Sequence, residues 1–151
     1  MLTDLVNTIS LSKIEKLIVK SRIDGRSFFQ LSDGDKKHCI DQVMLRGAAI
    51  CGCNLPDTDF FAKFIAEEIS AFILDFGYKE LTLSEIILAF RINAKGNFKN
   101  YANFAGLDIE QIVFYGNCIN VDYIAKVLSN YLTIRNILDR KLQNKIDGYE
   151  L

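Results

Sequence analysis

A chain of 151 residues, half of them hydrophobic and a quarter charged, has the composition of one folded domain and not of a disordered segment. Its formal net charge of −1 excludes a strong overall field that would attract nucleic acid or an acidic membrane. No apolar run approaches the roughly 18 residues of a membrane span, and the N-terminus, with Asp4, lacks the positive start of a secretory signal. The four cysteines are therefore expected to be reduced thiols in a cytoplasmic protein.

Two helices are predicted at the start of the chain. Ser12 and Glu15 form a capping-box pattern ahead of a helix over about residues 12–22. Ser32 begins a second helix over about residues 33–51. The connector between them contains three apolar residues that we expect to pack into the core: Phe28, Phe29 and Leu31. Within the second helix, the small residues of 47–49 would let another helix, or a second copy of the chain, approach closely.

The third predicted helix, about residues 58–76, is the most apolar in the chain. Asp57 or Thr58 would cap it after the break at Pro56, and Gly77 would end it. Its apolar residues cover most of its circumference: Phe60, Phe61, Phe64, Ile65, Ile69, Phe72, Ile73 and Phe76. A helix of this kind is usually buried at the centre of a domain, and we expect that place for it.

The fourth predicted helix, about residues 82–94, organises the rest of the chain. Thr82 and Glu85 form a second capping-box pattern. The residues after the cap share one wholly apolar face: Leu83, Ile86, Ile87 and Phe90. Because this face must be buried, the segments that follow are expected to be its packing partners.

Residues 97–119 are rich in Asn and Gly, and the pattern leaves helix and loop both open. Asp108 is expected to cap a short helix over 108–115. A long last helix is predicted over about residues 121–145, capped by Asn120 or Asp122 and closed by Gly148. The sequence thus predicts an all-α, single-domain bundle of five or six helices covering residues 1–151.

A metal site would have to be built from His38, Cys39, Cys51 and Cys53. Cys51-Gly52-Cys53 is one residue shorter than the usual zinc knuckle, and adjacent helical residues such as His38 and Cys39 point about 100° apart. We therefore expect ordinary thiols and no metal. His38 is the single histidine, and its position beside two lysines indicates a surface residue and not a catalytic base.

Other catalytic patterns are missing from the sequence. Glu67 and Glu68 are adjacent and face different ways on a helix, and Glu85 is explained as a cap. Neither GxGxxG nor GxxxxGK[ST] occurs. The expectation is a protein that is not an enzyme and has no cofactor.

A partner-binding surface is the remaining candidate. Basic and aromatic residues alternate after the fourth predicted helix, and such a pattern can bind single-stranded nucleic acid by stacking and phosphate contact. Together with basic residues of the last helix, the candidate partner-binding residues are Arg91, Lys95, Lys99, Tyr101, Arg135 and Arg140. The alternative is that the aromatics fill the core and the lysines are simply solvated.

Arg135 falls on the apolar stripe of the last helix, four residues after Tyr131. A charge at that place must find a counter-ion or emerge at a surface. Pairing with Asp139 one turn on is one interpretation, and presentation to a partner is the other.

Residues of about 79–145, within the motif-bearing part 79–148, resemble small helical replication-accessory or helicase-loader-like proteins of bacterial phages and integrative elements. The matching segments are Leu81-Thr82-Leu83-Ser84-Glu85-Ile86, Ala89-Phe90, Ala94 with Gly96, Tyr115-Gly116, and Val127-Leu128-Ser129-Asn130-Tyr131 with Arg135. Residues 97–108 depart from the short Gly turn of that pattern. No functional residue is carried over from the resemblance.

The leading hypothesis is a non-enzymatic accessory protein of a phage or mobile element that binds a macromolecular partner. The resemblance implies a role in DNA replication, with the helicase or nearby single-stranded DNA as the partner. One alternative is a phage-encoded inhibitor of a host defence nuclease, of the anti-CRISPR kind. Another is a self-associating structural protein that uses the small residues of 47–49 as a homo-oligomer contact, and a small zinc enzyme comes last.

Overall fold

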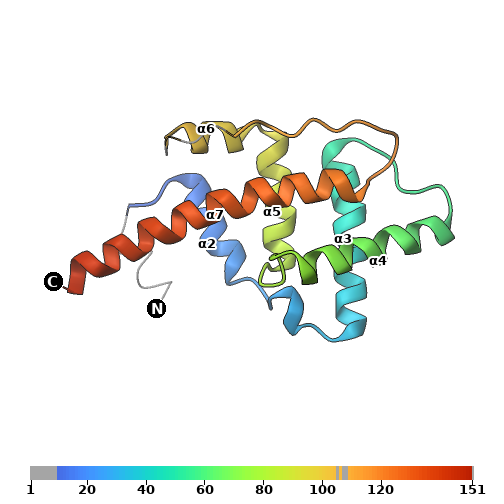
Figure 1. The fold of residues 1–151 in the computed structure, drawn as a ribbon, viewed down its shortest axis with the longest axis horizontal. Helices are drawn as coiled ribbons and strands as arrows, with labels where there is room; N and C mark the ends of the chain where they lie inside the picture. Colours follow the sequence, from blue (N-terminus) through green and yellow to red (C-terminus); the bar gives the residue numbers. More distant parts are fainter. Residues whose placement is uncertain (1–9, 105, 107–108, 151) are drawn as a thin grey trace.

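The computed structural model describes residues 10–104, 106 and 109–150, and this part of the chain is all-α (Figure 1). It forms six α-helices and one short 3-10 helix: α2 (Lys13–Arg22), η1 (Phe28–Gln30), α3 (Asp33–Cys51), α4 (Asp59–Asp75), α5 (Leu83–Ala94), α6 (Asn97–Phe104) and α7 (Val121–Glu150). The predicted all-α bundle is confirmed. Within the described residues, no helix is long and apolar enough to cross a membrane.

α5 is the central helix of the bundle. In Figure 1, α2, α5 and α3 lie side by side with α5 in the middle; α7 crosses all three, and α4 crosses α3. Eight of the twelve residues of α5 are buried, and the helix packs against α2, α3, α6 and α7. The prediction that this helix organises the rest is confirmed, because its apolar residues find partners on almost every side.

Local capping signals set most helix starts where the sequence predicts them. Ser12 with Glu15, and Thr82 with Glu85, form complete capping boxes at α2 and α5. Thr58 caps α4, and the Asn120 side chain accepts a hydrogen bond from the Tyr123 amide at the start of α7. Phe28 of the connector is fully buried, whereas Phe29 remains 44% exposed.

The prediction that the third helix is central was wrong. α4 buries one face, through Ile65, Ile69 and Ile73, against the rest of the bundle. Phe60, Phe61 and Phe64 are 74%, 51% and 49% exposed. Its first turns reach the right-hand margin of Figure 1, beyond α3. High hydrophobicity alone therefore did not place this helix at the centre.

The segment after α5 also differs from the expectation. Residues 97–104, for which the sequence left helix and loop both open, form α6, whereas residues 109–115, expected to be helical, have no helix. The Asn93 side chain explains this, because its amide nitrogen and oxygen both bond to the backbone of Ile112 at 2.9 Å. This pairing fixes the backbone at Ile112 against α5. Asp108, the expected cap, lies outside the described residues.

The last helix requires a further correction, because α7 does not close at Gly148 but continues to Glu150. The expected close approach of another helix at the small residues of α3 is confirmed, with Gly47 and Ala48 buried inside the bundle and Ala49 exposed. A Cβ at Gly47 would lie 3.2 Å from Cζ of Phe90, so the missing side chain lets α5 approach α3.

Candidate functional site

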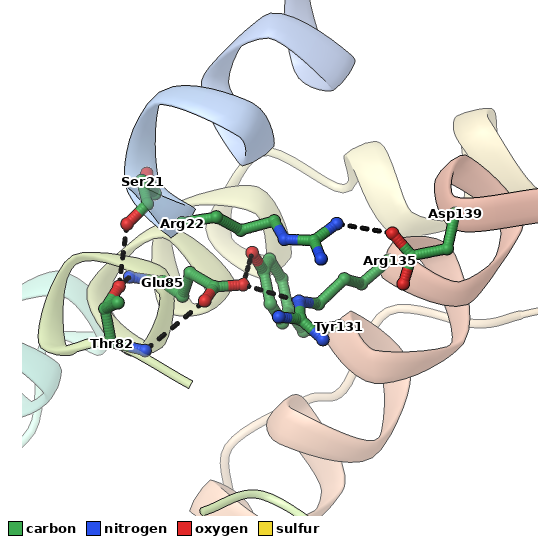
Figure 2. Close-up of polar contacts among 7 residues, drawn as sticks. All are labelled: Ser21, Arg22, Thr82, Glu85, Tyr131, Arg135 and Asp139. Atoms are coloured by element: carbon green, nitrogen blue, oxygen red, sulfur yellow. Dashed lines mark hydrogen bonds and ion pairs between the residues drawn. The ribbon is translucent and has the colours of Figure 1, made fainter. Parts of the chain in front are cut away.

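A cluster of charged residues is buried where α5 meets α7 and α2 (Figure 2). The carboxylate of Glu85 is fully buried and accepts hydrogen bonds from the Tyr131 hydroxyl at 2.7 Å and from Nε of Arg135 at 2.8 Å. Its other oxygen accepts from the backbone amide of Thr82 at 3.3 Å. Burial, and then the Glu85 carboxylate, raise the pKa of Tyr131, so this phenol stays protonated.

A second ion pair extends this cluster to α2. Arg22 pairs with Asp139 on α7, beside the Glu85–Arg135 pair (Figure 2). The hydroxyl of Thr82 donates to the carbonyl of Ser21 at 2.7 Å. We call Arg22, Glu85, Tyr131, Arg135 and Asp139 the polar junction. Its groups satisfy one another, so it joins three helices without an open site for a substrate.

The proposed role of Arg135 in partner binding was wrong. Its side chain is 12% exposed and its counter-ion is Glu85, not Asp139. The expected partner, Asp139, pairs with Arg22 instead. The sequence did show that Arg135 lies on a buried stripe, but it did not show which distant carboxylate would meet it.

Tyr101 also belongs to an internal contact. Its hydroxyl donates to Glu15 on α2 at 2.9 Å, and Lys141 of α7 pairs with the other oxygen of Glu15 at 2.8 Å. Burial raises the pKa of the Glu15 carboxyl, but hydrogen bonds from Lys141, the Ser12 amide and Tyr101 outweigh it and lower the pKa below its ordinary value. Burial, and then Glu15, raise the pKa of Tyr101.

The other predicted partner-binding residues remain at the surface. Arg91, Lys95, Lys99 and Arg140 are exposed, and Lys99 pairs with Glu110 at 3.2 Å. The first three lie close along the chain at the corner between α5 and α6. The stacking part of the predicted nucleic-acid surface is weakened, because Phe98 is fully buried and Tyr101 bonds to Glu15.

The sulfur residues and His38 do not form one cluster. Cys39 is buried in the core, where burial raises its pKa to about 11, and His38 is exposed on α3. Cys51 and Cys53 are half-buried at the end of α3, with their Sγ atoms 3.0 Å apart. In the part of the chain that the structure describes, no group of three or more His, Cys, Asp or Glu residues is placed to hold a metal ion.

A groove of about 860 Å³ lies between α3 and α4. Its apolar lining includes Ile40, Met44, Leu45, Leu55, Ala62, Ala66 and Leu74, and its charged lining includes Asp33, Lys36, Lys37, Asp41, Asp59, Lys63 and Glu67. Phe60, Phe61 and Phe64 are exposed on the same helix α4 but do not line the groove, and the rings of Phe60 and Phe64 meet edge to face at 4.9 Å. We call the groove together with Phe60, Phe61 and Phe64 the α3–α4 face.

Sequence reasoning missed the α3–α4 face as a functional candidate. A signal was present, because α4 carries more large apolar residues than one face of a helix can bury. This excess of apolar residues was interpreted as a sign that the helix lies at the centre of the bundle. The exposed phenylalanines show that it serves an outer surface instead.

The fold and these surfaces define an all-α protein that buries its charged network and exposes an apolar groove. Comparison with protein-family models, with curated protein sequences and with solved structures gives no significant match. Functional assignment therefore depends on the residues and contacts of this chain.

Proposed function

We propose that this chain is a non-catalytic docking protein that binds another protein on its α3–α4 face. The observation that carries the proposal is the groove of about 860 Å³ between α3 and α4, whose lining includes the exposed Leu45 and Leu55, together with the exposed Phe60, Phe61 and Phe64 elsewhere on α4. Clustered apolar surface of this kind is unusual on a monomer and often marks an interaction site. Aromatic residues of this type are also enriched among the residues that dominate binding energy.

The charges around the groove favour a protein over a nucleic acid. Three lysines and four acidic residues line it, so a polyanionic backbone would meet more acidic than basic side chains there. A folded protein with mixed charges can pair with both signs. Because two helices form the walls, an amphipathic helix of the partner is the element that fits the shape best.

The biological setting in this proposal rests on the resemblance of residues 79–145. It makes the replicative helicase of a phage or mobile element, or a protein near it, the first partner to test. The resembling segment contains α5 and most of α7, whereas the docking face lies on α3 and α4. In this proposal, residues 79–145 mainly stabilise the fold, and α3 and α4 determine which partner is bound.

Site-directed photo-crosslinking tests the proposal directly. A photoreactive phenylalanine analogue at position 64 should crosslink one specific protein in cells that carry the gene, and the same analogue at Phe76 should not. Phe76 is a matched control because it is 69% exposed at the C-cap of the same helix but is not part of the α3–α4 face.

Binding to the identified protein should then fall at least tenfold in a Phe60→Ser/Phe64→Ser variant, a loss of about 1.4 kcal/mol or more. A Lys95→Ala/Lys99→Ala variant should bind normally. The reverse result, with binding lost only in the lysine variant, would transfer the function to the corner between α5 and α6. Retained binding in both variants would contradict the proposal.

A further inference from the structure

Two thiols face each other where α3 ends. Cys51 is the last residue of α3, and its thiol and that of Cys53 form a hydrogen bond with 3.0 Å between the two Sγ atoms. Both side chains are half-buried and are therefore within reach of a small reagent in solution. Cys39, in contrast, is 2% exposed and lies in the core.

The backbone at Gly52 brings the two thiols together. Gly52 adopts a left-handed conformation with φ of 77°, which a glycine tolerates best. The amides of Gly52 and Cys53 both donate to the carbonyl of Ala48, at 2.9 and 3.0 Å. The turn is therefore fixed by hydrogen bonds, and closing the sulfurs to a disulfide length of about 2.05 Å requires a movement of about 1 Å.

A third thiol lies near this pair. Residues 53–54 run beside residues 117–119: the Asn54 amide donates to the Asn117 carbonyl, and the Ile119 amide donates to the Asn54 carbonyl, both at 2.9 Å. This pairing carries Cys118 close to Cys53. Burial, then the hydrogen bond with Cys51, raise the pKa of Cys53 to about 12, with a smaller effect from Cys118. Cys53 therefore keeps its proton near neutral pH.

We infer that Cys51 and Cys53 form a redox-active dithiol that exchanges with small disulfides of the glutathione class. The Cys51 sulfur, after losing its proton, attacks oxidised glutathione and forms a mixed disulfide while one glutathione thiolate leaves. Cys53 then loses its proton and attacks the Cys51 sulfur, which expels the second glutathione. Two protein thiols are oxidised, one disulfide bond forms, and oxidised glutathione is reduced to two thiols by the same two electrons. This inference does not depend on the proposed docking function.

Thiol counting on the intact, folded protein tests the inference. The full chain is equilibrated with buffers of reduced and oxidised glutathione, quenched with acid, denatured and alkylated, and its mass is measured. Reduced protein should take up four alkyl groups, one for each cysteine, and oxidised protein should take up two. Peptide mapping of the oxidised wild type should find the disulfide between Cys51 and Cys53.

Single serine variants provide the controls. Cys51→Ser and Cys53→Ser should each lose the internal disulfide, and Cys53→Ser should accumulate the mixed disulfide at Cys51. Cys39→Ser and Cys118→Ser should form the internal disulfide as the wild type does. Uptake of four alkyl groups under all buffers, or a disulfide that maps to Cys118, would overturn the inference. Because the mapping uses wild-type protein, misfolding of a variant leaves that test intact.

Discussion

The polar junction and the α3–α4 face reverse the usual places of charged and apolar side chains. The junction buries the Glu85 carboxylate and the Tyr131 phenol and partly buries two arginines among three helices, whereas the face exposes three phenylalanines to solvent. In the junction, the groups named in Figure 2 satisfy one another. On the face, the large apolar rings have no matching surface among the described residues.

This difference separates residues that build the molecule from residues available to a partner. A buried ion pair that loses one member leaves an uncompensated charge, so its removal is costly. An exposed phenylalanine that is removed loses little in the isolated protein, because it is already in contact with water. The two regions should therefore respond to mutation in opposite ways.

Glu85→Ala should produce the largest loss of stability. Arg135 would remain 12% exposed without its counter-ion, and the Tyr131 hydroxyl would lose its acceptor. Removing one member of such a buried pair typically costs about 3–5 kcal/mol, to be measured by urea unfolding. Asp122→Ala is the control. It breaks an exposed ion pair with Lys126 within α7, the helix that carries Arg135, and should change stability little. Equal effects for both variants would mean that the junction does not stabilise the fold.

Gly47→Val should give the next largest effect. The added side chain would meet the ring of Phe90, whose Cζ lies 3.2 Å from the Cβ position, and such overpacking costs about 1–3 kcal/mol. Thermal and urea unfolding would both measure it. Gly34→Ala is the matched control on the same helix, since nothing lies within 4 Å of its Cβ position, and it should leave stability unchanged or slightly raised.

Glu15 should contribute a smaller, pH-dependent effect. Its pKa in the folded protein lies below the ordinary value of 4.5, so the unfolded chain binds its proton first as the pH falls. Its stabilising contribution is complete above 4.5 and is lost as the pH falls through the lowered value. The difference in unfolding free energy between the wild type and Glu15→Gln should therefore shrink in acid. A difference that stays constant with pH would contradict this role.

Phe60→Ser/Phe64→Ser should have the smallest effect on the isolated protein. Both rings are about half exposed or more, and surface changes of this kind usually shift stability within about 0.5 kcal/mol. Urea unfolding of the double variant measures this value. A loss comparable to that of Glu85→Ala would show that the rings are part of the core and would remove the contrast between the two regions.

The sequence predicted those features of the fold that depend on neighbouring residues. Thr82 with Glu85, and Ser12 with Glu15, are three residues apart, and both capping boxes form. The wholly apolar face of α5 is likewise a local pattern, and it is buried. These elements were predictable because the interactions that define them lie within one turn of helix.

Features that depend on distant contacts were not predictable in the same way. The counter-ion of Arg135 is Glu85, from a different helix, whereas the sequence offered only the neighbour Asp139. Residues 109–115 form no helix, and the side chain of Asn93 on α5 bonds to the backbone of Ile112 within them. The exposure of α4 could not be predicted for the same reason. Its hydrophobic residues show that the helix has a large apolar surface, but they do not show which other segment packs against that surface.

The backbone pairing between Asn54 and Cys118 has a consequence for the order in which the molecule assembles. It joins the loop before α4 to the segment before α7, so it closes a long loop that contains α4, α5 and α6. Closing a long loop has an entropic cost that contacts within a helix avoid. The capped helix α5 is therefore expected to form early in folding. The backbone pairing between Asn54 and Cys118 is expected to form late and to break first during unfolding.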